Sequence, residues 1–205
     1  MKILSKFLVP VGILSTSIFN PCFADESEGI YFKGSTGITD IRDVTASALG
    51  VSVPLVVDSK SVYEIGFGYD FGNDIRTEFV YDRISGSISK INGVASSVDL
   101  GASTISASIF KDFSNESKFT PYVGIGIGTT KINTGTLTIA GTSLAGSNNN
   151  TRTITLTAGT GYKFNETSNL FLEINNRKVG DLSVGDVQYT DITTLGFNAG
   201  IRILI

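Results

Sequence analysis

The residues of this chain best suited to chemistry are carboxylates and cations that alternate with glycines and apolar residues. The segment VYEIGFGYDFGNDIRTEFVYDR, residues 62–83, contains Glu64, Asp70, Arg76, Glu78 and Asp82. Two neighbouring carboxylates can divide the roles of general acid and general base, and charges of both signs can line an ion path. The same side chains also form ion pairs whose role is only structural. Which role applies depends on the surface of the fold that these residues occupy.

The sequence contains no histidine, which narrows this chemistry. Hydrolases built on a Ser-His or Asp-His arrangement are excluded, and so are metal sites with histidine ligands. Asp181, Asp186 and Asp191 lack the spacing of a calcium-binding loop, and the glycines of 124–128 lack the spacing of a phosphate-binding loop. We therefore expect no enzymatic activity, no cofactor and no bound metal.

The charged residues of 62–83 alternate with apolar ones in the way that a pleated strand requires. Residues 63–71 place an aromatic or aliphatic side chain at every second position, and residues 75–81 repeat the pattern, with one threonine among them. Gly72 and Asn73 lie between the two runs and predict a tight turn. The segment is therefore predicted to be a β-hairpin with one apolar face and one face of glycines and charges.

Two orientations of such a hairpin are open. In a soluble barrel, for example a periplasmic or secreted ligand carrier of the lipocalin kind, the apolar face points inward. In a transmembrane barrel the apolar face meets lipid, and the narrow interior holds glycines and ion pairs. We adopt the transmembrane orientation because a solvated polar face seldom combines glycines with charges in this way.

The first 24 residues have the pattern of a secretory signal peptide: two lysines, an apolar segment too short for a membrane anchor, and a polar exit that ends at Ala24. A lipoprotein with Cys22 as its lipidated residue is the alternative, but residues 19–21 lack the small and aliphatic side chains of a lipobox. We expect cleavage after Ala24, which leaves residues 25–205 as one domain.

Loss of residues 1–24 would also change the composition of the chain. It removes the only cysteine, so the mature chain forms no disulfide. Of the 16 basic residues two lie in this segment, which leaves 14 against 19 acidic residues and a net charge of −5. This balance argues against a nucleic-acid partner. An exported, glycine-rich chain without a run of apolar residues long enough for a membrane helix favours a barrel of the bacterial outer membrane.

Eight alternating segments are predicted strands, at about 29–40, 62–71, 75–83, 98–113, 119–132, 151–164, 170–177 and 195–205. Long connections at 41–61, 85–97, 133–150 and 180–188 alternate with short turns at 72–73, 114–118 and 165–169. This asymmetry is typical of outer-membrane barrels. The predicted fold is therefore all-β, an eight-stranded antiparallel up-and-down transmembrane β-barrel behind a cleaved N-terminal signal peptide. The N- and C-termini are expected in the periplasm.

The alternation turns eleven charged residues toward the interior, and these nearly balance: Lys33, Glu64, Asp70, Arg76, Glu78, Asp82, Asp112, Lys163, Glu173, Arg177 and Arg202. An eight-stranded barrel has room for side chains and little else. We predict an interior ionic network of Lys33, Glu64, Arg76, Glu78, Glu173, Arg177 and Arg202. Its centre, formed by Lys33, Arg76, Glu78, Glu173 and Arg202, is expected in the periplasmic to middle part of the barrel. We favour an electrostatic plug over an ion path or a catalytic carboxylate pair.

Four segments carry a resemblance to a known family: GYDFGNDIRTEFVYD at 68–82, FTPYVGIGIG at 119–128, FLEINNRKVGDL at 171–182 and NAGIRILI at 198–205. With these segments the chain resembles the opacity-protein family of small outer-membrane barrels, which is related to the OmpA-like transmembrane domain. The resemblance implies an eight-stranded barrel with surface loops that contact host cells or vary antigenically. The chain departs from the family pattern in ending at Ile205, where an aromatic residue is usual, and in having no tryptophan. The interfacial aromatic girdles are then expected from Tyr31, Tyr63, Tyr69, Phe71, Tyr81, Phe113, Tyr162 and Phe164.

Two functional hypotheses follow for such a barrel. The first is a structural or surface-interaction protein, adhesin-like or antigen-like, that displays four extracellular loops. The alternative is a small passive pore for ions or solutes, which requires the interior network to open. The expected partners are outer-membrane lipid and lipopolysaccharide, the barrel-insertion machinery, and host or cell-surface ligands of the loops. The sequence leaves the loop ligand and the oligomeric state open.

Overall fold

The computed structural model describes residues 28–42, 44–48, 51–55, 60–91, 94–134, 137–139, 142–144, 148–184, 187–190 and 192–205. The predicted signal peptide, residues 1–24, lies outside the described residues. Within these ranges, no helix has the length and apolar character needed to cross a membrane.

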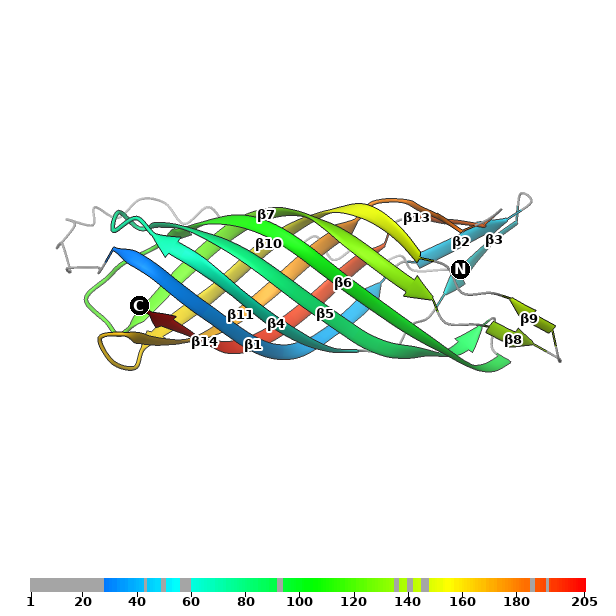
Figure 1. Ribbon diagram of the computed structural model, residues 1–205, viewed down its shortest axis with the longest axis horizontal. Helices are drawn as coiled ribbons and strands as arrows, with labels where there is room; N and C mark the ends of the chain where they lie inside the picture. Colours follow the sequence, from blue (N-terminus) through cyan, green and yellow to red (C-terminus); the bar gives the residue numbers. More distant parts are fainter. Residues whose placement is uncertain are drawn as a thin grey trace, which may run out of the picture.

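Eight antiparallel strands close into a barrel in the order β1-β14-β11-β10-β7-β6-β5-β4 (Figure 1). These strands are β1 (Gly29–Arg42), β4 (Lys60–Asp70), β5 (Ile75–Ile91), β6 (Val94–Asp112), β7 (Phe119–Thr134), β10 (Asn148–Lys163), β11 (Ser168–Val179) and β14 (Thr193–Leu204). The first and last barrel strands pair from Tyr31↔Leu204 to Arg42↔Thr193, which closes the cylinder. The predicted eight-stranded up-and-down barrel is confirmed.

The strands are staggered around the barrel. Register partners followed strand by strand from Gly29 run through Asp70, Arg76, Phe110, Gly124, Thr157, Asn175 and Gly196, and they return to the first strand at Thr39. The stagger from Gly29 to Thr39 is ten residues over eight strands. The strands therefore tilt, and positions at equal height are offset by about 1.25 residues from one strand to the next.

The two ends of the barrel differ in their connections. Short turns at 71–74, 113–118 and 164–167 join strands at one end, where the C-terminus also lies (Figure 1). We call this the short-turn end, and the opposite end the loop end. The loop end carries a four-stranded sheet of β2 (Val44–Ala48), β3 (Val51–Leu55), β12 (Leu182–Val184) and β13 (Val187–Thr190), and a small hairpin of β8 (Leu137–Ile139) and β9 (Thr142–Leu144).

The predicted long connections are therefore partly β-structure, which corrects the expectation of loops. In particular, the predicted connection 85–97 continues β5 and β6 as paired strands as far as Ile91↔Val94, with a register shift between Ile88 and Lys90. Period-two alternation marks a strand only where its two faces meet different surroundings. Beyond the barrel wall this difference is lost, so the pattern did not mark these extensions.

Apolar side chains cover the outer wall and charged ones fill the interior. Phe67 and Phe79 are each 51% exposed and stack on the outside with ring centroids 5.5 Å apart. Glu78, which directly precedes Phe79 in the chain, faces the interior and is 1% exposed. Ile125 also points outward, and Arg202 points inward. This arrangement confirms the transmembrane orientation and excludes the soluble one, in which the two faces would be exchanged.

One predicted member of the aromatic girdles was wrong. Tyr31 is buried in the interior, 4% exposed, because Ile30 and Phe32 on either side of it point outward. The other seven residues lie on outward positions, and two of them, Tyr69 and Phe71, form a ring pair at the short-turn end with centroids 4.9 Å apart. Phe119, which was not predicted, joins this girdle through Tyr162 at 5.0 Å.

Candidate functional site in the barrel interior

Glu78 on β5 is the centre of the charged interior. Its carboxylate accepts hydrogen bonds from Lys33 Nζ at 3.1 Å, from Arg202 Nε at 3.1 Å and from the hydroxyl of Tyr31 at 2.9 Å. Arg76 Nη1 donates to the same carboxylate. Three cations from three strands thus meet one buried carboxylate, which satisfies the requirement that a buried charge be paired and hydrogen-bonded.

Glu173 on β11 is a second acceptor for the same cations. Lys33 Nζ lies 3.0 Å from its carboxylate, Arg202 Nη2 lies 3.0 Å from it, and the hydroxyl of Tyr122 donates to it at 2.9 Å. Lys33 and Arg202 therefore bridge Glu78 and Glu173. Strands β1, β5, β7, β11 and β14 are joined across the lumen by these contacts.

Two further carboxylates extend this cluster in opposite directions. Toward the short-turn end, Asp112 accepts from Arg76 Nε at 2.9 Å. Toward the loop end, Glu64 lies 3.8 Å from Lys33 Nζ and accepts from Ser35 at 2.7 Å and from Asn198 at 2.8 Å. We define the ionic network as Lys33, Glu64, Arg76, Glu78, Asp112, Glu173 and Arg202.

Aromatic rings line the network. The Arg76 guanidinium lies 4.0 Å from the centroid of Phe110, and the Arg202 guanidinium lies 4.4 Å from that of Phe171 and 4.7 Å from that of Tyr122. Such cation–π contacts are strongest where water is excluded. The ring of Tyr122 crosses the strand at Gly159, where a Cβ would come within 2.6 Å of the Tyr122 hydroxyl. A glycine at this position is thus required by the close approach of the ring.

Arg177 does not join the ionic network. It forms a bidentate pair with Asp82, Nη1 at 3.0 Å and Nη2 at 2.9 Å, nearer the loop end. Thr104 accepts from Arg177 at 3.4 Å and begins a chain of hydroxyls to Thr130 at 3.0 Å and on to Thr153 at 2.5 Å. Beyond this level the buried interior residues include four aliphatic ones, Val62, Ile84, Val179 and Ile192.

The structure thus brings together six of the seven predicted network residues, with Arg177 apart. Asp112, predicted only to face inward, belongs to the cluster through Arg76. Sequence reasoning missed Tyr31, Tyr122, Phe110 and Phe171 as interior residues. The alternation could have predicted such a residue, because Tyr122 lies between the outward residues Pro121 and Val123 and therefore points inward.

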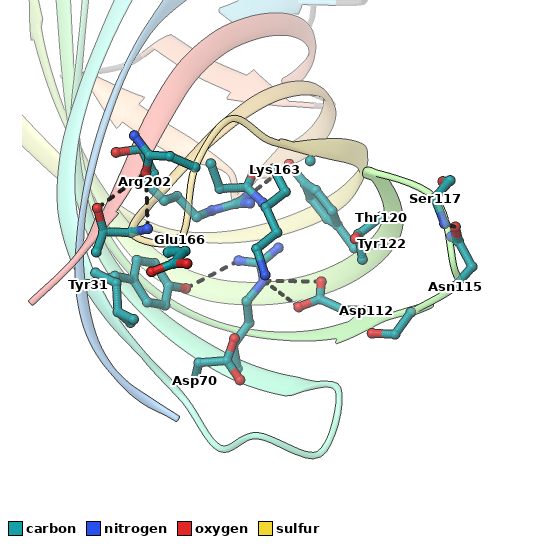
Figure 2. Close-up of a pocket in the computed structure, with 18 residues that line it drawn as sticks. Tyr31, Asp70, Asp112, Asn115, Ser117, Thr120, Tyr122, Lys163, Glu166 and Arg202 are labelled. Carbon is teal, nitrogen blue, oxygen red and sulfur yellow. Dashed lines mark hydrogen bonds and ion pairs between the residues drawn. The ribbon is translucent and has the colours of Figure 1, made fainter. Parts of the chain in front are cut away.

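A cavity of about 200 Å³ opens at the short-turn end (Figure 2). Arg76, Arg202, Tyr31 and Tyr122 are among its lining residues, as are side chains from the turns at 113–118 and 164–167. The ionic network thus lies at the inner boundary of this cavity. Arg76 Nη2 is buried there and has no hydrogen-bond partner among the described residues, a group that bound water can satisfy.

The geometry favours structure over catalysis in this interior. Each carboxylate of the ionic network is held by a cation, and Glu78 and Glu173 also accept from tyrosine hydroxyls. A carboxylate so engaged is poorly placed to take a proton from a substrate. Among the described residues, no group of three or more histidine, cysteine or acidic side chains is arranged to hold a metal ion.

Comparison with known proteins agrees with this architecture. Residues 8–202 match the family described as outer membrane protein beta-barrel domain. Neisserial surface protein A is similar in structure, with a TM-score of 0.60 and 20% sequence identity over 86% of this chain and 97% of that protein. Outer membrane protein OprG from Pseudomonas aeruginosa has a TM-score of 0.56 and 13% identity over 86% of this chain and 97% of its own. At these identities the similarity shows the fold alone. No curated protein matches the sequence closely enough to count as a relative.

Proposed function

Because this chain belongs to the outer membrane protein β-barrel domain family, we propose that it is an integral outer-membrane protein whose barrel is a closed scaffold for surface segments at its loop end. In this proposal the loop end faces outside, and the short turns and both termini face the periplasm. The protein is not an enzyme, and its partners are host or cell-surface ligands of the loop-end segments.

The observation that carries this proposal is the filled lumen. Among the residues that the structure describes, Glu78, Asp82 and Thr104 are the largest fully buried side chains, and they lie at two levels between the ends of the barrel. The ionic network fills the first level, and the Asp82–Arg177 pair with its threonines fills the second. A wall held from within by paired charges suits a rigid support better than a water-filled channel.

The loop end supplies the surface that such a support would display. The connections before β4 and before β14 combine into one sheet, since β13 pairs with β2 from Gln188↔Ser47 to Thr190↔Thr45. The strands VTASA and VSVPL of this sheet carry no charged residue. Low charge and main-chain pairing across two connections are suited to recognition of a protein or glycan surface.

Removal of this sheet tests the proposal. Residues 44–55 and 182–190 would each be replaced by a short glycine-serine turn, and attachment of expressing cells to host-cell or bacterial surfaces would be measured. We expect attachment to be lost while the barrel still shows heat-modifiable migration in detergent gels. Unchanged attachment with an intact barrel would remove the surface-interaction function.

The topology is tested separately. An epitope inserted in the chain between Ile91 and Val94, which are register partners on β5 and β6, should be detected on intact cells, and the same epitope at 165–167 should be detected only after permeabilisation. The reverse result would place the loop end in the periplasm and overturn the proposed display role.

A passive pore is the second candidate, and the cavity at the short-turn end favours it, because this cavity already leads to the ionic network. Planar-bilayer recordings on the refolded protein decide between the two. We expect no conductance from the unaltered protein. Reproducible conductance that changes in Arg76→Gln or Glu78→Gln variants would establish a pore and displace the closed scaffold.

A further inference from the structure

Four basic side chains project from the lipid-facing wall at the loop end. They are Arg83 on β5, Lys131 on β7, Arg152 on β10 and Lys178 on β11, and we call them the basic arc. All four are exposed, and each lies two residues beyond an outward-facing residue of the wall. Within the barrel wall they thus occupy the outward face, in contrast to the cations of the ionic network.

The strand registers make these four residues neighbours. Arg83 pairs with Ser103, and Ser103 pairs with Lys131, so the two cations lie in one row about 10 Å apart. Asn150 pairs with Lys131, which places Arg152 diagonal to Lys131 on the same face. Because Ile154 pairs with Lys178, Arg152 is also diagonal to Lys178. Diagonal neighbours lie about 7–8 Å apart, so the arc is continuous over five adjacent strands.

The arc also lies at one height, at the edge of the apolar wall. Its members are eight to twelve residues from the short-turn ends of their strands at Ile75, Phe119, Lys163 and Ser168. In strands tilted by about 40° this is about 20–30 Å, which matches the apolar band of about 25 Å in outer-membrane barrels. With the stagger taken into account, the four heights agree within about three residues. The arc is thus level with lipid headgroups at the loop end.

The charges of the arc have no counter-charge in the part of the chain that the structure describes. Among the described residues, none of the four side chains forms an ion pair or hydrogen bond. The outward cation near the opposite rim differs, because Lys111 Nζ lies 2.8 Å from Asp74 Oδ2.

We propose that the basic arc binds the phosphate groups of an acylated glycolipid in the outer leaflet, the lipid A part of lipopolysaccharide. Acyl chains of such a lipid would lie against the apolar wall below the arc, and its phosphates would receive charge-assisted hydrogen bonds from the two arginines and two lysines. This inference rests on the proposed topology, in which the loop end meets the outer leaflet.

The experiment compares matched pairs of lysines. Lys131→Gln/Lys178→Gln removes two charges of the arc, and Lys111→Gln/Lys118→Gln removes two exposed lysine charges near the short-turn end. Each full-length protein would be refolded, checked for heat-modifiable migration, and mixed in detergent with purified lipid A. Retention would be measured by native mass spectrometry.

We expect the arc variant to bind lipid A about thirtyfold more weakly than the unaltered protein, because each lysine near an anionic surface contributes about 1 kcal/mol of attraction. The control variant should bind lipid A as well as the unaltered protein does. Dephosphorylated lipid A should not be retained by any of the three. Equal retention by both variants would overturn the proposal.

Two further arms identify the source of the phosphate. If phosphatidylglycerol is retained as tightly as lipid A, or if inorganic phosphate displaces lipid A, the arc recognises phosphate in general and its assignment to the outer-leaflet glycolipid is wrong. The epitope test of topology stands apart from these measurements. A loop end found in the periplasm, with lipid A still bound in detergent, would refute the display role and leave the binding chemistry of the arc in place.

Discussion

The two halves of the lumen pair their buried charges in different ways. In the half near the short turns, Lys33 is shared among three carboxylates and Arg202 between two, and Glu78 serves three cations. In the half near the loop end, Asp82 and Arg177 form a single pair, followed by threonines and then by aliphatic residues. Shared charges cannot be removed one at a time without leaving others unpaired, whereas a single pair can be replaced as a unit. The difference predicts which half tolerates substitution.

Loss of Glu78 should have the largest effect. Glu78→Ala would leave Lys33, Arg76 and Arg202 short of a buried carboxylate, and breaking a buried ion pair in this way costs about 3–5 kcal/mol. The measurement is the free energy of unfolding by urea in lipid vesicles. Glu116→Ala, in an exposed turn, is the control and should change it by less than about 0.5 kcal/mol. Equal effects of the two substitutions would remove the distinction between shared and surface charges.

At the Asp82–Arg177 pair, one substitution should lower the free energy of unfolding, and replacing both residues should restore it. Arg177→Met alone leaves Asp82 charged and buried, which should lower the free energy of unfolding by about 3 kcal/mol. Asp82→Leu/Arg177→Met should return the free energy of unfolding to within about 1 kcal/mol of the unaltered protein, because an apolar pair of similar size needs no partner. The matching exchange in the other half, Asp112→Leu/Arg76→Met, should not recover, since Arg76 also serves Glu78. Recovery in both halves would contradict the comparison.

Removal of a single hydroxyl should also destabilise the half near the short turns more than the half near the loop end, with smaller losses of unfolding free energy. The Tyr122 hydroxyl donates to Glu173 and accepts from Arg202, so Tyr122→Phe should cost about 2 kcal/mol. Thr130→Val interrupts only a chain of neutral hydroxyls and should cost about 1 kcal/mol. Urea unfolding of both variants in the same vesicles compares them directly. A larger loss of unfolding free energy for Thr130→Val would show that the half with the ionic network tolerates substitution at least as well as the other half.

The smallest effect is expected outside the lumen, at the turn between β4 and β5. Partial burial would raise the pKa of Asp74, but hydrogen bonds from Lys111 and Ser114 lower it below the ordinary value. A carboxyl whose pKa is lower in the folded than in the unfolded state stabilises the fold above about pH 4, and this contribution is lost as the pH falls through the lowered pKa. The pair is partly exposed and screened, so its contribution is below about 1 kcal/mol.

Unfolding of Asp74→Asn followed from pH 6 to pH 2 checks this. Asparagine tolerates the positive φ of 63° at this position, so the backbone should be unchanged. The stability difference between the two proteins should shrink toward zero at the acid end. A difference that stays constant over this range would show that the ion pair contributes nothing.

Much of the barrel could be predicted because lipid and lumen impose opposite demands on alternate residues. That rule identified the strands, the orientation of Phe67 and Glu78, and the inward charges. It could not decide which inward charges touch, because partners such as Glu78 and Arg202 are 124 residues apart in sequence and meet only through the stagger. Arg177 was therefore grouped with the wrong carboxylates. The rule also failed to identify structure above the apolar band, where the basic arc and the extensions of β5 and β6 lie.

The pairing of β1 with β14 has a consequence for biogenesis. Tyr31 and Leu204 are register partners, so the cylinder cannot be sealed until the final strand has been synthesised and delivered. Until that moment two unpaired edges, one on β1 and one on β11, remain open to mispairing with other chains. Sealing joins segments at maximal separation along the chain, which makes it the slow step expected of non-local pairing.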